Sequence, residues 1–420
     1  MSETSALWQQ LGADINGEAP GDGSGVHVSL SSDGRSVAIG GWLNDGFGNE
    51  SGHVRIYRLD GSDQWVQVGA DIDGEAEGER SGYSLSLSDD GKTLAVGAYR
   101  NSDAEYRAGQ VRIYQLNEVD EWVQVGADIN GDGPHHTSGF VLSLTGDGQS
   151  VVIGSAPIRV YKLNEGNQWV QVGSDIGSQE SRNDEFEGGS VSLSSDGRTL
   201  ATGAPFNDSV ATNAGRARIY RLNDVDEWVQ LGADFYGDNA EDLLGWCVSL
   251  SADGQTLAIG TPGNDGSANN AGRVRIYQLS DVDEWVQVGG DLYGENAEDQ
   301  LGLYKSISLS DDGQTVALGS RSNDANGEDS GHVRVYRLND NAEWVQLSVD
   351  IDGEAAGDRS GGSVSLSGDG QTLAIGADHN DGSGDNAGHV RIYQLKLPEP
   401  PPVFQSANTS GDGTKVILHF

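Results

Sequence analysis

One unit recurs seven times along the sequence, and this repetition limits what the chain can fold into more than any other feature. Three short markers recur in the same order: a W-x-Q phrase, an R-I/V-Y phrase and an Asp-Gly pair. The W-x-Q phrase begins at Trp8, Trp65, Trp122, Trp169, Trp228, Trp285 and Trp344. The successive spacings are therefore 57, 57, 47, 59, 57 and 59 residues. Periods of this kind are typical of propellers, solenoids and repeat arrays, whose units bury their apolar surface by stacking on one another.

Each unit contains the pattern of four short β-strands and no helical periodicity. An alternating run such as V-S-L-S precedes a tight S-x-D-G turn, in which Gly accepts positive φ without steric cost. A second apolar run, T-L-A-I-G-A, and a loop rich in Asn, Asp and Gly follow the turn. The third strand is G-H-V-R-I-Y-Q-L and the fourth is E-W-V-Q-V-G-A-D-I. We therefore predict an all-β fold, a seven-bladed β-propeller of four-stranded antiparallel blades.

The two ends of the repeat region predict how the ring closes. Residues 8–15 are a fourth strand without the preceding three, and residues 389–395 are a third strand without a following fourth. We expect these segments to pair. The propeller then occupies residues 1–396, and the proline-rich residues 397–402 form a stiff linker. Residues 403–420 would begin a further β domain, which makes the ring a monomeric propeller within a longer chain.

The chain is strongly acidic, with 65 Asp and Glu against 25 Lys and Arg and a net charge of −40. Such a surface repels nucleic acid and anionic lipid and attracts cations. No apolar run approaches the about 18 residues of a membrane-spanning helix, and the first ten residues lack the pattern of a secretory signal. The single cysteine, Cys247, forms no intrachain disulfide, and we expect it to be a buried apolar residue. We expect an extracellular or cell-surface protein with neither a nucleic-acid partner nor membrane insertion.

The units resemble FG-GAP-type repeats, the blades of integrin α-chain propellers and of many bacterial surface proteins. The residues that carry the resemblance are G-x-S-V-S-L-S-x-D-G, ending for example at Gly370, then T-L-A-I-G-A and G-H-V-R-I-Y. The resemblance implies a protein or glycan partner bound through a loop face, and often calcium in blade loops. This sequence departs from the integrin calcium loop, because a short S-x-D-G turn stands in its place. For Asp33, Asp90 and their equivalents we therefore expect a turn-forming role.

The crossings between blades are acidic in every copy and offer two interpretations. The first Asp of the crossing occurs as Asp14, Asp71, Asp128, Asp175, Asp234, Asp291 and Asp350. These side chains are expected to cap turns by accepting backbone N–H groups. In the alternative they bind Ca²⁺, which takes roughly six to eight oxygen ligands. The candidate calcium ligands are Asp71, Asp73, Glu75, Asp14, Asp350 and Asp352.

The third unit departs from the common length, because its loop between the second and third strands is missing. The same unit carries His135 and His136 in its crossing. One interpretation is a structural or neutral role for this pair. The other is a ligand groove formed by His135, His136, Asp128 and Asp132.

The remaining repeated residues are expected to build the ring. The Arg of each R-I-Y phrase should lie between blades and pair with acids, and the Trp and Tyr side chains should pack between blades. His53, His332 and His389 begin third strands, and we expect them to be exposed.

Two functional classes remain open. The sequence contains no nucleophile elbow, no phosphate-binding Gly loop and no paired metal-binding His. We therefore predict a non-catalytic recognition, adhesion or spacer module. It would bind a protein or glycan through the acidic long-loop face, which carries the crossings between blades and the loops between second and third strands. Calcium-dependent binding is one form of this prediction. The alternative is a polysaccharide-active hydrolase or lyase, with two acids about 5 to 9.5 Å apart at the propeller axis. We expect no basic and aromatic cluster around the axis of the kind that a quinone cofactor would need.

Overall fold

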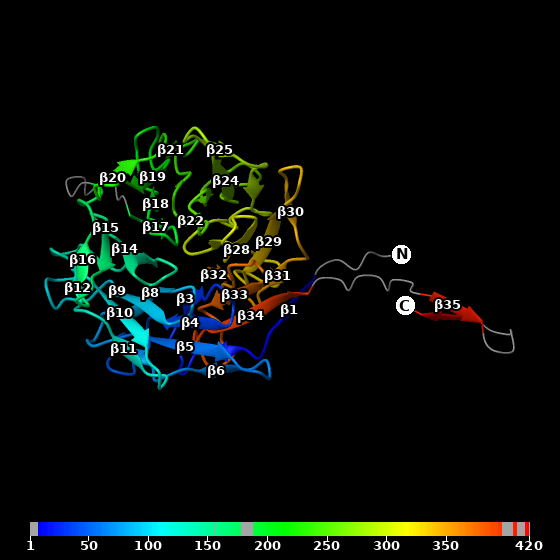
Figure 1. Ribbon diagram of the computed structural model, residues 1–420, viewed down its shortest axis with the longest axis horizontal. Coiled ribbons are helices and arrows are strands. Elements are labelled where there is room, and N and C mark those ends of the chain that lie inside the picture. Colours follow the sequence, from blue (N-terminus) through cyan, green and yellow to red (C-terminus); the bar gives the residue numbers. More distant parts are fainter. Residues whose placement is uncertain (1–6, 156, 178–187, 397–405, 410–415, 420) are drawn as a thin grey trace.

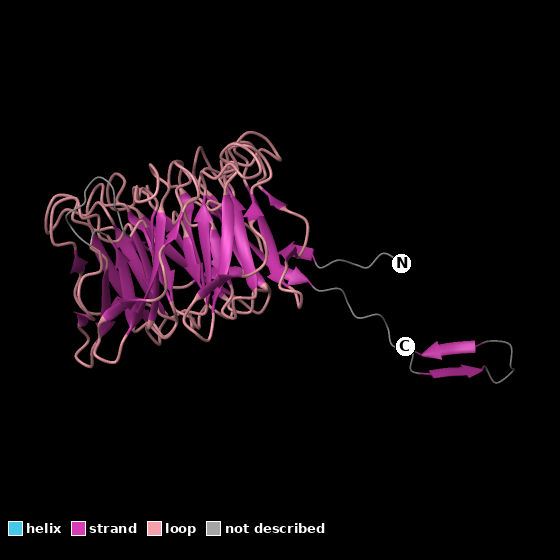
Figure 2. Cartoon of the chain, turned by 90° about the horizontal axis from the view of Figure 1, so that it is seen from above, coloured by secondary structure: helices cyan, strands magenta, loops and turns pink. Residues whose placement is uncertain are grey.

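The computed structural model describes residues 7–155, 157–177, 188–396, 406–409 and 416–419. Within these residues every regular element is a β-strand, and seven antiparallel sheets stand around a central axis (Figure 1). Seen edge-on, the strands run through the thickness of the ring and the loops gather on its two faces (Figure 2). The predicted seven-bladed β-propeller is confirmed. The described residues contain no helix that is long and apolar enough to cross a membrane.

The strands of each blade follow one another from the axis outward. Blade one contains β3 (Ser24–Leu30), β4 (Ser36–Gly41), β5 (His53–Leu59), β6 (Trp65–Gln67) and β7 (Ile72–Asp73). Blade two contains β8 (Ser81–Leu87), β9 (Thr93–Ala98), β10 (Gln110–Leu116), β11 (Trp122–Gln124) and β12 (Ile129–Asn130). Blade three contains β13 (Val141–Leu144), β14 (Ser150–Gly154), β15 (Arg159–Leu163) and β16 (Trp169–Gln171). Blade four contains β17 (Ser190–Leu193), β18 (Thr199–Ala204), β19 (Arg216–Leu222), β20 (Trp228–Gln230) and β21 (Phe235–Tyr236).

The other three blades have the same order. Blade five contains β22 (Val248–Leu250), β23 (Thr256–Thr261), β24 (Arg273–Leu279), β25 (Trp285–Gln287) and β26 (Leu292–Tyr293). Blade six contains β27 (Ile307–Leu309), β28 (Thr315–Ser320), β29 (His332–Leu338), β30 (Trp344–Gln346) and β31 (Ile351–Asp352). Blade seven contains β32 (Ser363–Leu366), β33 (Thr372–Ala377), β34 (His389–Lys396), β1 (Leu7–Gln10) and β2 (Ile15–Asn16). Outside the ring, β35 (Ser406–Thr409) and β36 (Val416–His419) form a hairpin, and the predicted linker at residues 397–402 lies outside the described residues.

The ring closes as predicted, through the N-terminal segment. Strand β1 pairs antiparallel with β34, from Leu7 opposite Lys396 to Gln10 opposite Tyr393. Strand β2 continues the pairing, with Ile15 opposite Val390. Blade seven therefore takes its outer strand from the start of the chain and its other strands from the end of the repeat region.

The fourth strand of the blade is broken in two, whereas the sequence predicted one continuous strand. In blade one, β6 and β7 both pair with β5, and Gly69 adopts a positive φ of 75° between them. The Gln67 side chain spans this break by donating to Asp71 Oδ1 at 2.6 Å. The indole of the next blade docks at the break, where Trp122 Nε1 donates to the Val68 carbonyl at 3.0 Å. A Cβ on Gly69 would lie 2.8 Å from that indole, so the break is a docking site that a side chain would fill.

Seven apolar clusters lie between consecutive blades and form the core. Between blades one and two, for example, Val54 and Ile56 pack with Leu85 and Val96. The Ser of the alternating inner strand links the same blades, because Ser29 Oγ accepts the Leu87 N–H at 3.0 Å. The equivalent bond is present at all seven interfaces. The alternation of Ser with Val or Leu thus satisfies N–H groups that would be unpaired at the axial sheet edge.

Candidate functional site

The Asp-Gly turns hold the hairpins together, as the sequence predicted. Asp33 Oδ1 accepts the Ser31 hydroxyl at 2.6 Å and the Arg35 N–H at 2.9 Å, and Gly34 adopts a positive φ of 65°. The hydroxyl-to-Asp bond occurs in all seven turns. These carboxylates therefore complete local turns.

The acids of the crossings also have structural partners. Asp242 Oδ2 accepts the N–H groups of Asp238 and Asn239 at 2.8 and 3.1 Å. Asp22, Asp299 and Asp358 cap their crossings in the same way. The first Asp of every crossing accepts the side chain of the W-x-Q glutamine. Backbone capping is thus seen for the later acid of the crossing, such as Asp242. The first Asp, for which the sequence predicted backbone capping, instead accepts a side-chain amide in the contacts described.

The candidate calcium ligands fall into two groups. Asp14, Asp71 and Asp350 each lie near a histidine and a glutamate, as part of a cluster that includes His389, His53 or His332. Asp73, Glu75 and Asp352 belong to no such three-residue cluster within the described residues. Instead Glu75 Oε1 lies 2.9 Å from Arg112 Nη1, and Asp352 pairs in register with His332 on β29. Calcium binding by these acids stays a prediction.

The three strand-initial histidines are buried, so the expectation that they are exposed is wrong. His53, His332 and His389 expose 1%, 0% and 2% of their surface. Each of these histidines follows a Gly at the start of a strand. A polar residue at such a position is typical of an exposed strand end, and this pattern led to the wrong expectation. In the ring, however, the crossing from the preceding blade covers this position. Burial, reinforced by the positive charge of Arg334, holds the pKa of His332 well below its usual value.

The candidates in blade three have separate partners. Asp128 accepts Gln124 Nε2 at 2.7 Å and Gln110 Nε2 at 3.1 Å, and Asp132 forms an ion pair with Arg159. The His135 ring packs edge-on against Tyr106, with 5.2 Å between ring centroids. The ligand groove proposed for His135, His136, Asp128 and Asp132 stays a prediction.

The residue that begins each inner strand differs from blade to blade, although its neighbours in the sequence repeat. This position follows the closing Gly of the crossing and holds Val26, Tyr83, Phe140, Gly189, Trp246, Lys305 and Gly362. In blade six, Leu303 and Tyr304 are inserted between the closing Gly302 and this position, so Lys305 is the residue equivalent to Trp246 of blade five. A hollow of about 390 Å³ is lined by residues of this segment. Every blade contributes to its lining, so this hollow lies on the propeller axis.

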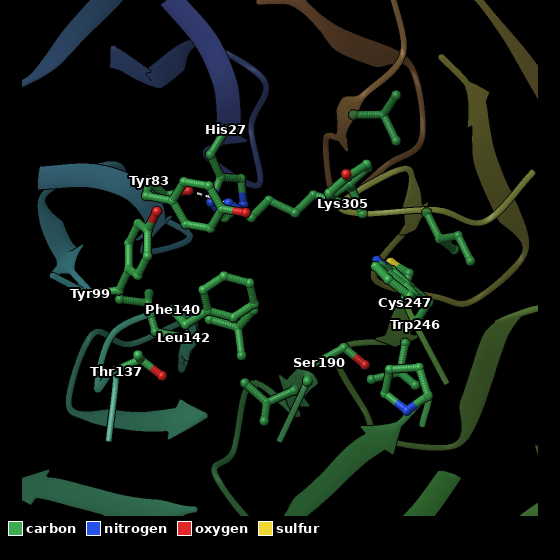
Figure 3. Close-up of a pocket in the computed structure, with 18 of the residues that line it drawn as sticks. His27, Tyr83, Tyr99, Thr137, Phe140, Leu142, Ser190, Trp246, Cys247 and Lys305 are labelled. Atoms are coloured by element: carbon green, nitrogen blue, oxygen red, sulfur yellow. Dashed lines mark hydrogen bonds between the residues drawn. The ribbon is translucent and has the colours of Figure 1, made fainter. Parts of the chain in front are cut away.

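An aromatic wall surrounds this axial hollow. Tyr83 packs against Trp42, Tyr99 and Phe140, with ring centroids 5.4, 4.7 and 5.2 Å apart. Figure 3 shows Tyr83, Tyr99 and Phe140 on one side of the hollow and Trp246 on the other. Trp246 extends the wall by packing against Phe206 and Tyr304 at 5.3 and 6.1 Å. Rings in such numbers form a surface suited to flat or bulky apolar groups.

Lys305 crosses the hollow between the two aromatic sides (Figure 3). Its Nζ lies 4.3 Å from the centroid of the Tyr83 ring and donates to the Tyr83 carbonyl. Burial lowers the pKa of this amine to about 7, against the opposing attraction of Asp378. Burial also raises the pKa of the neighbouring Cys247 thiol to about 12, so this cysteine is an unreactive apolar residue near neutral pH.

A second hollow, of about 440 Å³, adjoins the first and shares Tyr83, Tyr304 and Lys305 with it. It is rich in cations: Arg321 lies over the Tyr304 ring at 4.9 Å, and Arg359 Nη1 lies 3.1 Å from His379 Nε2. We call the two hollows together the axial pocket. Basic side chains thus gather at one place on a chain whose net charge is −40.

Asp378 is the one carboxylate among the described residues that line the axial pocket. Burial opposes its ionisation, but His379 and Arg321 together hold the pKa of this carboxyl below its usual value. His379 Nδ1 lies 3.1 Å from Asp378 Oδ1. The hydrolase or lyase alternative needs two acids, and the described lining of the pocket supplies one; that alternative stays a prediction. The expectation that the axis lacks basic and aromatic residues is wrong.

The sequence contained a signal for the axial pocket that the repeat markers concealed. When the units are aligned, the strand-initial position and the one after T-L-A-I-G-A differ from blade to blade. The second position holds Trp42, Tyr99, Pro205, Pro262, Arg321 and Asp378 in blades one, two and four to seven. Side chains from both positions line the pocket. Departures from a repeat, compared position by position, would have identified the site.

Comparisons with known proteins agree with the fold. No protein-family model and no curated protein sequence matches the chain. Among solved structures it is similar to Kuenenia stuttgartiensis hydrazine synthase, with a TM-score of 0.53 and 15% identity, over 91% of this chain and 98% of that one. It is also similar to the Cps50 (Swd1) β-propeller domain of Myceliophteria thermophila, with a TM-score of 0.58 and 12% identity, over 91% of this chain and all (100%) of that one. At these identities the similarity shows the fold alone.

Proposed function

We propose that this chain is a non-catalytic recognition module whose axial pocket binds an acidic segment of a protein partner, one that carries a bulky apolar side chain. The observation that carries the proposal is the departure of the axial positions from an otherwise uniform repeat. Propellers commonly present such a rim of loops to their partners. The resemblance of the repeats to FG-GAP-type blades supports a cell-surface or secreted setting.

The chemistry of the pocket selects the kind of segment. The aromatic wall takes a ring or branched aliphatic side chain, because Trp246, Tyr83 and Phe140 offer apolar surface around a hollow of about 390 Å³. Lys305 and Arg321 lie beside that hollow and favour a carboxylate. The acidic surface elsewhere on the ring disfavours binding of an acidic segment outside the pocket, so the charge contrast directs such a segment to the pocket.

A peptide array tests the proposal. Every member places Phe, Tyr, Trp or Leu beside Asp or Glu, and matched members carry Lys in place of the acid. We expect binding of acidic members alone and roughly 30-fold weaker binding by Trp246→Ala, the loss typical of an interface hot spot. Phe47→Ala is the matched control, because Phe47 is exposed and does not line the pocket.

Two results would overturn the proposal. One is equal binding by the wild type and Trp246→Ala, which would place recognition elsewhere on the ring. The other is binding of oligosaccharides rich in uronic acid with no binding of peptides, which would replace the protein partner by a glycan.

A further inference from the structure

Three neighbouring blades bury a histidine against the first Asp of the crossing that follows. His53, His332 and His389 begin the third strands of blades one, six and seven. The Nδ1 atoms of His53 and His332 lie 3.6 Å from Asp71 Oδ2 and Asp350 Oδ2.

A second carboxylate reaches each histidine from the crossing that precedes the blade. In blade one this is Glu18, whose Oε2 lies 3.9 Å from His53 Nδ1. Its other oxygen lies 3.5 Å from Arg55 Nη1, which orients the carboxylate. The complete clusters are Glu18, His53 and Asp71; Glu295, His332 and Asp350; and Asp14, Glu354 and His389. Within each cluster the three ligand atoms lie within 4.8 Å of one another.

The spacing in these clusters suits an ion better than a hydrogen bond. Both ring nitrogens of His53 and of His332 are buried and have no hydrogen-bond partner. A separation of 3.6 to 3.9 Å is too long for a hydrogen bond. Two ligands that each lie about 2.0–2.1 Å from a tetrahedral ion are roughly 3.3 Å apart, so a small inward movement would close each cluster.

The donor set selects the kind of ion. One imidazole nitrogen with two carboxylate oxygens is a set that suits Zn²⁺ and related first-row divalent ions. Ca²⁺ and Mg²⁺ take oxygen ligands alone. The histidine therefore separates these clusters from the calcium loops that the acidic sequence suggested.

Other blades show what the same position does without a histidine. In blade five Arg273 stands there, and its Nη1 lies 3.5 Å from Asp291 Oδ2 and 2.7 Å from Asp238 Oδ2. In blade two Gln110 stands there and donates to Asp128 Oδ2 at 3.1 Å. A side chain that brings its own positive charge or N–H groups thus contacts the crossing acid directly, whereas the ring nitrogens of His53 and His332 have no hydrogen-bond partner.

We propose that blades one, six and seven each bind a divalent ion of the zinc class between the strand-initial histidine, the following Asp and the preceding Glu. These blades are consecutive around the ring. The cluster of blade seven joins Asp14 of the N-terminal segment to His389 of β34. An ion bound there ties the seam at which the ring closes.

The test uses the full chain, purified without a histidine tag and stripped with a chelator. Equilibrium dialysis against Zn²⁺ counts bound ions, and titration with Co²⁺ reports histidine ligation through its visible absorption. We expect three ions per chain, one for each cluster. His53→Arg, His332→Arg and His389→Arg should each lose one ion. These substitutions copy Arg273, so the variants are expected to fold; His→Gln versions, which copy Gln110, provide a second series.

The control is His135→Gln, which removes a histidine outside the three clusters and should bind as many ions as the wild type. Zn²⁺ should also raise the melting temperature of the wild type and leave that of the triple His→Arg variant unchanged, because an ion that binds only the folded ring stabilises it by mass action. The proposal is wrong if the wild type binds no ion, if the triple variant binds as many ions as the wild type, or if Ca²⁺ alone stabilises the ring.

Discussion

The outer strands of the ring and its axial end, the strand-initial residues that line the axial pocket, come from the same seven units. The contacts of the outer strands repeat from blade to blade, whereas the residues at the axial end differ. In the outer strands the indole N–H of five blades reaches the same carbonyl position of the preceding blade. At the axial end the strand-initial residue is Tyr83 in one blade, Trp246 in another and Gly362 in a third. Contacts that must close a ring are repeated, whereas contacts available to a partner are free to differ. The comparison separates residues that hold the ring from residues that give it a specific surface.

The largest effect is expected from a residue that holds the ring. Arg112 exposes 2% of its side chain and lies 3.1 Å from the equally buried Glu79. Arg112→Ala leaves that carboxylate buried without its charged partner and should lower the free energy of unfolding by about 3–5 kcal/mol. Chemical denaturation measures the loss. Arg198→Ala is the control, because the ion pair of Arg198 with Asp224 is exposed and should contribute nothing measurable. Equal losses in the two variants would show that the buried Arg112–Glu79 pair stabilises the ring no more than an exposed pair does.

Lys305 should behave in the opposite way, since the axial pocket holds it at a cost to stability. The pKa of its amine is lowered to about 7 in the folded chain, against about 10.4 in an unfolded chain. Between these values the unfolded chain binds more protons, so stability rises with pH across the window. Lys305→Met removes this cost and should stabilise the ring by about 2 kcal/mol at pH 6.

The advantage of Lys305→Met should shrink between pH 7 and pH 10, as melting curves at several pH values will show. The same variant should bind acidic peptides more weakly, because it lacks the cation. An advantage that does not change with pH would show that the amine is not buried in the way described.

Axial aromatic residues should matter for binding and little for stability. Tyr99→Ala should weaken peptide binding on the order of 10-fold, since Tyr99 belongs to the wall of the pocket rather than to a core cluster between blades. Its melting temperature should stay close to that of the wild type. A large fall in melting temperature without a change in binding would show that Tyr99 stabilises the ring and does not contribute to peptide binding.

The smallest effect is expected in a single turn. Asp253 Oδ1 accepts the Ser251 hydroxyl at 2.6 Å and the Gln255 N–H at 2.9 Å. Asp253→Ala should cost about 1 kcal/mol, the typical net contribution of such hydrogen bonds. Because the turn recurs in every blade, the equivalent Asp90→Ala should cost the same amount within error. Different costs would show that the turns are not equivalent.

The sequence predicted the frame well because a repeat displays each contact seven times. The W-x-Q phrase, the Asp-Gly turn and the unpaired end segments sufficed for the blade, the ring and its closure. The break in the fourth strand was missed because Gly69 and its equivalents look like ordinary strand residues until an indole is seen to dock on them. The burial of His332 was missed because the crossing that covers it is not adjacent in the sequence. The stacking of blades brings the two together, and no local sequence pattern shows this.

The axial pocket was missed for a different reason. Tyr83, Trp246 and Lys305 are single departures in separate units, 59 residues apart in the case of the last two. Each by itself resembles random variation in a loop. Ring closure brings their positions to one axis, and only then do they form a wall with a cation across it. The sequence shows which residues these are, but their proximity follows from the closure of the ring.

The pairing that closes the ring also decides how the protein responds to tension. Leu7 lies opposite Lys396, so the chain enters and leaves the propeller at the same end of one antiparallel strand pair. A pull on the two ends therefore loads the Leu7–Lys396 pair first and the Asn16–His389 pair last, so the two strands separate one residue pair at a time. Hydrogen bonds loaded one after another resist far less force than bonds sheared together. Stretched between its ends, the ring would open at blade seven while the other six blades stayed stacked.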